Sequence, residues 1–123
     1  ASSTALTQII DVLPTLADLL GVETPETVEG TSLAPLLEDP NAVLHDAIYS
    51  DANWPHGVDA GRRQSIRTDD WLYSRYPDIG EHELFDLNGD PSQTRNVADR
   101  RSDVVSELAA RLDRWEARRA SQE

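Results

Sequence analysis

Oxygen-bearing side chains occupy every second position of one stretch late in the chain: Asp86, Asn88, Asp90 and Ser92. This spacing is typical of a calcium-binding loop, in which carboxylate and amide oxygens surround the ion. Such a loop also needs a sharply turned glycine and a bidentate glutamate, and those two positions hold Pro91 and Val97. We therefore expect no metal site here, and predict a turn whose Asp and Asn side chains bind its own backbone.

The three histidines are the next candidates for chemistry: His45, His56 and His82. No two of them are four residues apart, so their spacing excludes a helical zinc pair. The chain has no cysteine, which excludes disulfides, thiol catalysis and thiolate metal sites. His56 stands in a glycine-flanked loop beside Trp54, where an imidazole can meet a substrate or be tuned by a carboxylate. The alternative, an exposed loop histidine without a role, is the more common case.

Arginines follow this loop closely. Arg62, Arg63 and Arg67 could hold an anion through paired N–H groups, or could pair with the many carboxylates of the chain. We take Trp54, His56 and Arg63 as candidates for lining a substrate cleft. There is no Gly-x-Ser-x-Gly motif and no glycine-rich phosphate loop, so no catalytic residue and no metal ligand is assigned.

The chain is strongly acidic, and its charge is unevenly distributed. The net charge is −12, lysine is absent, and all 11 arginines lie from Arg62 onward. Phosphate binding requires a basic surface, so nucleic acid is a poor partner. An arginine-only, aspartate-rich composition suggests a GC-rich genome or a halophilic, high-salt cytoplasm, in which salt screens the repulsion between carboxylates.

Two further bounds come from the chain as a whole. No stretch of about 18 apolar residues is present, so we expect a soluble protein without a membrane span, and no compartment is assigned. The chain begins at Ala1 and contains no methionine. We interpret it as a processed or excised piece of a longer product.

The elements that position these residues begin with two short helices. Asp11 stands where an N-cap belongs and Gly21 where a left-handed stop belongs, so a helix is predicted over residues 11–20. Its apolar residues recur at helical spacing and predict one buried face: Val12, Leu13, Leu16, Leu19 and Leu20. Ser32 is predicted to cap a second helical turn.

The rest of the chain predicts strands and one long helix. Four runs are rich in strand formers: residues 45–50, 63–68, 71–76 and 83–87. The short turns between the later runs favour antiparallel pairing. Residues 51–61 predict a loop long enough to form the lip of a site. Ser102 is predicted to cap a final helix with one apolar stripe: Val104, Val105, Leu108, Leu112 and Trp115.

This order of elements predicts an α+β fold, in which a small antiparallel sheet of about four strands is covered by a long C-terminal helix and preceded by short helices. We expect two parts. Residues 1–44 form a helical segment, and residues 45–123 form a subdomain of sheet plus helix.

Several separated segments carry a family resemblance. Residues 11–21 read DVLPTLADLLG and residues 30–37 read GTSLAPLL. The segments IRTDDW at 66–71 and LFDL at 84–87, which come from the predicted strands and the turn between them, precede DPSQTRNVA at 90–98. In this order the segments resemble the C-terminal part of arylsulfatase-like sulfatases of the alkaline phosphatase superfamily. The corresponding family patterns are Asp-x-x-Pro-Thr, Gly-x-Ser-Leu-x-Pro-Leu-Leu and Asp-Pro-x-Glu-x-x-Asn-Leu-Ala. The chain departs from the family at Gln93, Phe85 and Leu72, where Glu, Tyr and Lys are usual.

The resemblance implies a subdomain of a sulfuric ester hydrolase that lacks the catalytic motifs and is inactive alone. In the family, a formylglycine made within Cys/Ser-x-Pro-x-Arg and the Asp/Asn ligands of a calcium ion lie N-terminal to these segments. No cofactor is therefore expected in this chain, and calcium and formylglycine are expected in its parent. The expected partner is the upstream sulfatase domain, to which residues 1–44 belong or against which they pack.

Three alternatives stay open. The chain could be a stand-alone acidic module for protein interaction, or a subdomain of a phosphatase-type or phosphonate-type hydrolase of the same superfamily. It could also form a homodimer through an exposed apolar face of its first helix.

Overall fold

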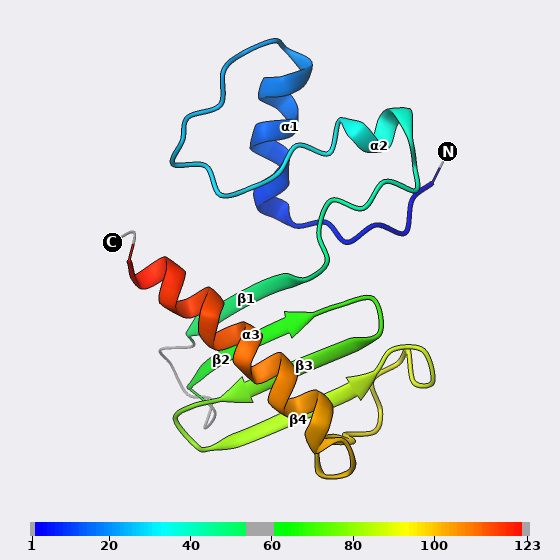
Figure 1. Cartoon of the computed structure of the whole chain (residues 1–123), viewed down its shortest axis with the longest axis vertical. Coiled ribbons are helices and arrows are strands. Elements are labelled where there is room, and N and C mark those ends of the chain that lie inside the picture. Colours follow the sequence, from blue (N-terminus) through cyan, green and yellow to red (C-terminus); the bar gives the residue numbers. More distant parts are fainter. Residues whose placement is uncertain (1, 54–60, 122–123) are drawn as a thin grey trace. The chain divides into compact units, whose positions relative to one another are not determined.

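The computed structural model describes residues 2–53 and 61–121. The chain divides into two compact units, Ala1–Ile48 and Tyr49–Glu123, called unit 1 and unit 2 below. Unit 1 contains short helices and long loops, and unit 2 contains a sheet with one long helix (Figure 1). None of the helices in these described residues combines the length and the apolar character that crossing a membrane requires.

Unit 1 is built from three short helical elements: η1 (Ile9–Asp11), α1 (Val12–Leu19) and α2 (Pro35–Glu38). Helix α1 ends in a Schellman motif, because the amide of Gly21 donates to the carbonyl of Asp18 and the amide of Val22 donates to that of Ala17. Gly21 adopts a φ of 65°, which a residue without a Cβ reaches at no steric cost. Its predicted role as the helix stop is confirmed.

The predicted buried face of α1 is wrong. Its large apolar side chains are exposed, from 45% for Val12 to 76% for Leu20, and Leu37 of α2 is 72% exposed. Apolar periodicity places these residues on the helix but does not supply anything for them to pack against. The described residues of unit 1 hold no complete strand and no helix longer than α1 that could cover them.

The predicted helix caps also need correction. Asp11 directly precedes α1, but its carboxylate does not cap that helix. The hydroxyl of Ser32 accepts a hydrogen bond from the amide of Ala34 at 3.2 Å, so Ser32 stabilises the turn just before α2 without being its N-cap. Ser102 is the first residue of the last helix, and the cap position belongs to Arg101. Sequence signals therefore place each helix start within a few residues.

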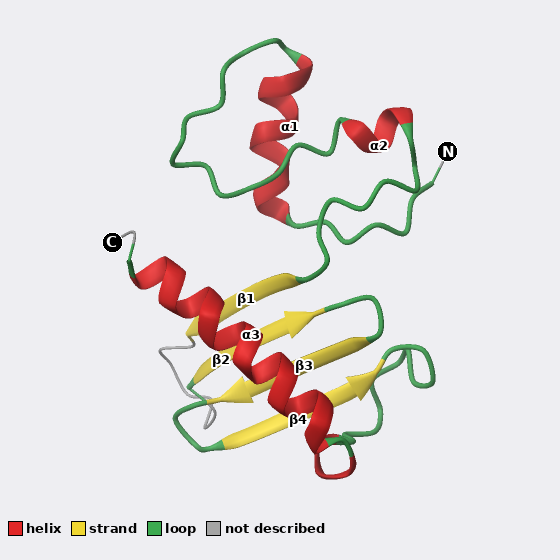
Figure 2. Cartoon of the chain, viewed as in Figure 1, coloured by secondary structure: helices red, strands yellow, loops and turns green. Residues whose placement is uncertain are grey.

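Unit 2 contains one four-stranded sheet whose strands follow one another in chain order: β1 (Ile48–Asn53), β2 (Arg62–Arg67), β3 (Trp71–Tyr76) and β4 (Glu81–Asp86). Strand β3 pairs in antiparallel register with both neighbours, so that Tyr73 lies opposite Ile66 of β2 and opposite Leu84 of β4. Figure 2 shows the four strands side by side. The predicted α+β class is confirmed.

Helix α3 (Ser102–Ala120) follows the short turn η2 (Ala98–Arg100) and lies across one face of the sheet (Figure 1). The core between them consists of apolar side chains from both layers: Ile66, Tyr73, Leu84, Ala98, Val104, Leu108 and Leu112. Near the end of α3, Trp115 stacks on Tyr49 of β1 with ring centroids 5.2 Å apart. The predicted apolar stripe of the last helix therefore does cover the sheet, with Val105 only partly buried.

Candidate functional site

Of the three residues predicted to line a substrate cleft, the structure describes only Arg63. Trp54 and His56 lie outside the described residues. Arg63 is exposed on β2, where its guanidinium donates to the hydroxyl of Ser74 at 3.0 Å and lies 5.9 Å from the ring centroid of Tyr76. Its role in a cleft therefore stays a prediction.

A buried carboxylate organises unit 1. Asp11 is 0% exposed, and its two oxygens accept three hydrogen bonds. The amides of Gln8 and Thr31 donate to it at 2.8 and 2.9 Å, and Nε2 of His45 lies 2.9 Å from Oδ2. We call Asp11 with these three partners the Asp11 clasp. It joins the approach to α1, the loop before α2 and the segment before β1.

The clasp keeps its carboxylate ionised. Burial of Asp11 raises its pKa, but the hydrogen bonds from Thr31, Gln8 and His45 lower it by more, so the pKa lies below its ordinary value of 3.8. The charge is thus compensated by donors, as a buried carboxylate requires.

Two further residues hold the same loops together. The hydroxyl of Thr15 donates to the carbonyl of Asp11 and accepts from the amide of Leu33 at 2.8 Å. Gly30 passes so close to the chain before α1 that an added Cβ would lie 2.0 Å from the carbonyl oxygen of Ile10. The Asp-x-x-Pro-Thr and Gly-x-Ser-Leu segments therefore have a structural role, since each supplies part of this contact.

The alternating acidic stretch near the end of β4 forms turns. Asp86 accepts from the backbone amides of Asn88 and Gly89 at 3.0 and 3.1 Å. Asp90 accepts from both the amide and the hydroxyl of Thr94, at 2.8 and 2.9 Å. The predicted Asx-rich turn is confirmed, because these oxygens serve local donors.

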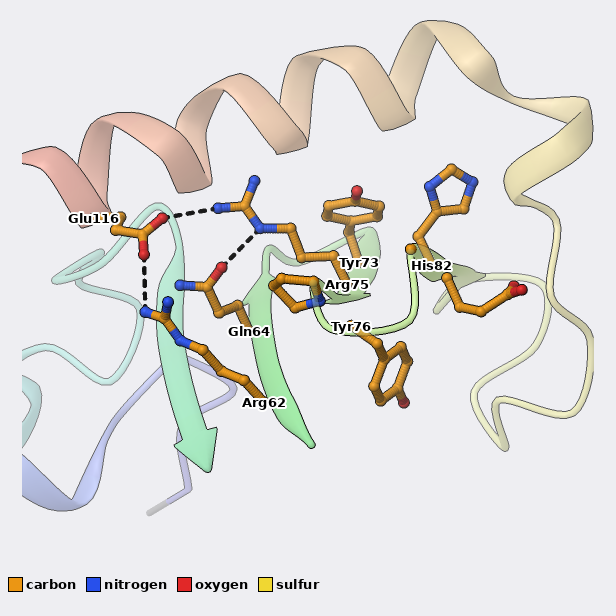
Figure 3. Close-up of a pocket in the computed structure, with 10 residues that line it drawn as sticks. Arg62, Gln64, Tyr73, Arg75, Tyr76, His82 and Glu116 are labelled. Atoms are coloured by element: carbon orange, nitrogen blue, oxygen red, sulfur yellow. Dashed lines mark hydrogen bonds and ion pairs between the residues drawn. The ribbon is translucent and has the colours of Figure 1, made fainter. Parts of the chain in front are cut away.

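Unit 2 contains a hollow of about 320 Å³ beside the core. Figure 3 shows its main side chains, which come from three strands, the turn between β3 and β4, and α3. We call it the β3–β4 hollow, and its lining is: Arg62, Gln64, Tyr73, Arg75, Tyr76, Pro77, Gly80, Glu81, His82 and Glu116. Of these residues, the sequence suggests Arg62 as a possible anion-binding or ion-paired side chain and His82 as one of three candidate histidines. It does not bring the two together, and it singles out none of the others.

An ion-paired network forms one wall of the hollow. Glu116 of α3 accepts from Arg62 at 2.8 Å and from Arg75 at 3.1 Å, one guanidinium on each oxygen. Arg75 also donates through Nε to the side-chain oxygen of Gln64 at 2.8 Å, and Gln64 is 1% exposed. Figure 3 marks these three contacts. Arg62 additionally forms a two-pronged pair with Asp51 of β1.

The electrostatics of this wall follow from those pairs. The hydrogen bond from Arg62 holds the pKa of Asp51 below its ordinary range, and the same contact raises the pKa of Arg62. Burial raises the pKa of Tyr73, so its hydroxyl stays protonated at neutral pH. Asp51 and Arg62 therefore stabilise each other in their charged forms.

The arrangement supports binding more readily than a reaction. The hollow holds hydroxyl, imidazole, carboxylate and guanidinium groups, but no serine, threonine or cysteine nucleophile lines it. Across residues 2–53 and 61–121, no group of three or more His, Asp or Glu side chains could hold a metal ion.

Sequence reasoning missed this hollow, although strand alternation carried a signal for it. Gln64 and Arg75 face each other at positions that point to the same side as Ile66 and Tyr73. A polar side chain at an inward position requires a polar partner, and Glu116 on the last helix is available. Gln64 and Arg75 could thus have been grouped with Glu116 from the sequence alone. The turn residues Pro77 and Gly80 could not, because no alternation pattern places them.

Comparison with known proteins gives a consistent result. Residues 1–118 match the family described as N-sulphoglucosamine sulphohydrolase, C-terminal. The N-acetylglucosamine-6-O-sulfatase of Bacteroides thetaiotaomicron is 34% identical over 102 residues, which cover 79% of this chain and 18% of that enzyme. This chain therefore spans less than a fifth of the length of that relative.

Solved structures with the same fold include two that are informative here. A crystal structure of a putative sulfatase from Bacteroides thetaiotaomicron matches with a TM-score of 0.77 and 29% identity, over 88% of this chain and 24% of that one. The phosphonate monoester hydrolase from Silicibacter pomeroyi matches with a TM-score of 0.67 and 28% identity, over 96% of this chain and 26% of that one.

Proposed function

This chain belongs to the N-sulphoglucosamine sulphohydrolase C-terminal family, and on that premise we propose that it forms the C-terminal part of a longer enzyme that hydrolyses sulfate esters. The similarity to N-acetylglucosamine-6-O-sulfatase supports a sulfated amino sugar as the substrate class. The match covers only 18% of the length of that relative, which supports a non-catalytic role for the chain itself.

The chemistry of the cofactors agrees with this division. A sulfatase of this kind uses calcium to polarise the sulfate and the hydrate of formylglycine as the nucleophile. This chain has no cysteine and no Ser-x-Pro-x-Arg sequence from which formylglycine could be made. The described residues also offer no cluster that fits a metal ion. The groups present do not fit either cofactor, which supports placing both in a part of the enzyme outside this chain.

The observation that carries the proposal is the apolar surface of unit 1. Its exposed large side chains are: Ile9, Ile10, Val12, Leu13, Leu16, Leu19, Leu20, Val22, Leu37 and Val43. An exposed apolar surface on a soluble protein often marks the place where a partner packs. The Asp11 clasp shapes unit 1 without using these residues, which leaves them available to pack on another body. That body is the sulfatase domain that precedes this region in the family.

A second copy of the chain is the competing partner for this surface. Sedimentation velocity of the chain at several concentrations distinguishes the two. Without the sulfatase domain, we expect the chain to self-associate and Leu16→Asp to weaken that association. When the domain is part of the same polypeptide, we expect the association to be lost. A dimer that persists in the longer polypeptide, with Leu16 still at its interface, would favour the homodimer.

A direct assay tests the absence of catalysis. The chain is incubated with calcium and an aryl sulfate, and we expect no turnover above the rate without protein. Turnover that copurifies with the chain refutes the proposal that its chemistry lies elsewhere. An acidic interaction module, the stand-alone alternative, predicts no turnover either, but it also predicts that the longer polypeptide hydrolyses no sulfate ester.

A phosphonate ester hydrolase is the second candidate. The similarity to the enzyme from Silicibacter pomeroyi, 28% identical over 96% of this chain, specifically favours it. The two enzymes differ in the catalytic part, so the longer polypeptide has to be assayed with an aryl sulfate and a phosphonate monoester side by side. A higher kcat/KM for the sulfate supports the first candidate.

A further inference from the structure

The β3–β4 hollow contains hydrogen-bonding groups that no described residue uses. Tyr73 is 3% exposed, yet its hydroxyl has no hydrogen-bond partner within residues 2–53 and 61–121. Every fully buried side-chain nitrogen or oxygen in that part of the chain does have a partner, so this hydroxyl reaches solvent through the hollow. A tyrosine buried to this extent usually has a partner for its hydroxyl.

The free hydroxyl lies among other groups that can donate or accept. Figure 3 shows Tyr73 with Arg75 on one side and His82 on the other. The rings of Tyr73 and His82 are tilted with centroids 6.1 Å apart, and both His82 and Glu81 are exposed at the rim. Neither rim side chain makes a hydrogen bond or ion pair to another described residue. Three polar groups therefore face one space.

The charges of the lining argue against an ionic ligand. Two arginines, Arg62 and Arg75, stand against two glutamates, Glu81 and Glu116, so the lining has no net charge when His82 is neutral. Both arginines are already paired with Glu116. An anion such as sulfate would have to compete with that carboxylate, and a cation would face the guanidinium groups. An uncharged ligand disturbs neither.

We propose that the β3–β4 hollow is a non-catalytic subsite for one uncharged sugar unit of a glycan. Sugar hydroxyls both donate and accept, so they can accept from the Tyr73 hydroxyl and donate to the free oxygens of Glu81. A volume of about 320 Å³ is at the small end of ligand sites and suits one ring. The choice of a saccharide over another polyol rests on the proposed function.

Binding can be measured without any sulfatase activity. The ¹⁵N-labelled chain is titrated with N-acetylglucosamine, with its 6-sulfate and with sodium sulfate, and the backbone amides are followed by NMR. We expect the uncharged sugar to shift the amides of Tyr73, Gly80 and His82, and sodium sulfate to leave them unchanged. Tyr73→Phe removes only the hydroxyl and should weaken sugar binding about fivefold, which is the loss of one neutral hydrogen bond.

Tyr49→Phe is the matched control, because Tyr49 stacks on Trp115 and does not line the hollow. It should bind the sugar as the parent chain does. A dispersed spectrum without shifts at high sugar concentration overturns the proposal, as do stronger shifts with sodium sulfate at the same amides. An undispersed spectrum removes the hollow itself and overturns it too. Sugar binding without sulfate ester hydrolysis by the longer polypeptide would refute only the proposed function.

Discussion

Replacing Asp11 by Asn tests whether the Asp11 clasp holds unit 1 together. The substitution keeps the size of the side chain, but one acceptor oxygen becomes an NH2 group. If the amide oxygen faces Thr31, the bond from the amide of Gln8 is lost, and His45 can keep its contact only by accepting from the NH2 group; if it faces the other way, the bond from Thr31 is lost. Either orientation leaves a buried N–H without an acceptor.

The magnitude follows from the number of bonds lost. A hydrogen bond to a charged group contributes about 1.5–3 kcal/mol, so the loss of at least one such bond should cost roughly 2 kcal/mol of the free energy that closes unit 1. Since about 1.4 kcal/mol is tenfold in an equilibrium constant, amide hydrogen exchange at Thr31 should speed up by about 30-fold. The amide of Leu33, held by Thr15, should follow it.

Hydrogen exchange read by NMR measures this residue by residue. Asp18→Asn is the matched control, since Asp18 is exposed in α1 and its carboxylate accepts, among the described residues, only from the hydroxyl of Ser32. We expect the control to change exchange at Thr31 by a small fraction of the effect of Asp11→Asn. Unchanged protection of Thr31 in Asp11→Asn would show that the loops of unit 1 are held by something other than this carboxylate.

Four other outcomes are expected. The pKa of Asp11 is lower in the folded chain than its ordinary 3.8, so its contribution to folding stability is complete above that value and is lost as the pH falls below it. Circular dichroism during acid titration should show this loss. Asp11→Asn should remove this contribution to the pH dependence. Gly30→Ala should open the same loops, since its Cβ would lie 2.0 Å from a backbone oxygen, whereas Gly89→Ala meets only a movable side-chain oxygen at 3.2 Å; equal melting temperatures would contradict this. Gln93 has a φ of 55°, so Gln93→Gly should raise the free energy of unfolding by about 0.5 kcal/mol and Gln93→Ala should not, as urea titration would show. If the composition reflects a high-salt cytoplasm, the thermal midpoint should be higher in molar salt, and equal midpoints would exclude that origin.

The sequence predicts unit 2 well because its signals are local and redundant. Strand β3 (Trp71–Tyr76) is placed correctly by its strand formers and its flanking turns, and α3 by its apolar stripe. Strand β1 starts at Ile48 instead of residue 45, and the side chain of His45 contacts Asp11, 34 residues earlier. A long-range contact of that kind leaves no mark on local periodicity.

Unit 1 shows the limit of periodicity more clearly. The stripe that includes Leu13 and Leu16 has the spacing of a buried face, but both residues are more than half exposed. Periodicity states which residues share a face and cannot state whether another body covers it. Asp11 likewise has the position of an N-cap, whereas its burial depends on loops 20 and 34 residues away.

The candidate sites divide in the same way. Motif spacing correctly predicts an Asx-rich turn at Asp86, since the hydrogen bonds that form this turn are local. The β3–β4 hollow depends on a strand pairing and on Glu116 of α3, which lies 54 residues after Arg62 and 41 after Arg75. Single residues such as Tyr73 therefore do not reveal it in the sequence. Arg63, which sequence reasoning favoured, stands next in the chain to Arg62, which lines the hollow. A shift of one residue changes the face of the sheet.

The Asp11 clasp has a consequence for how the chain unfolds. Its carboxylate closes a loop of 20 residues to Thr31 and a loop of 34 residues to His45 at a single point. In a chain without cysteine, this carboxylate acts as a non-covalent cross-link. A cross-link of this kind holds two loops closed, and closing them costs the chain conformational entropy. Unlike a disulfide, it cannot be reduced, and opening it releases both loops together. Unit 1 should therefore open in one step, and its opening should not depend on the redox state of its surroundings.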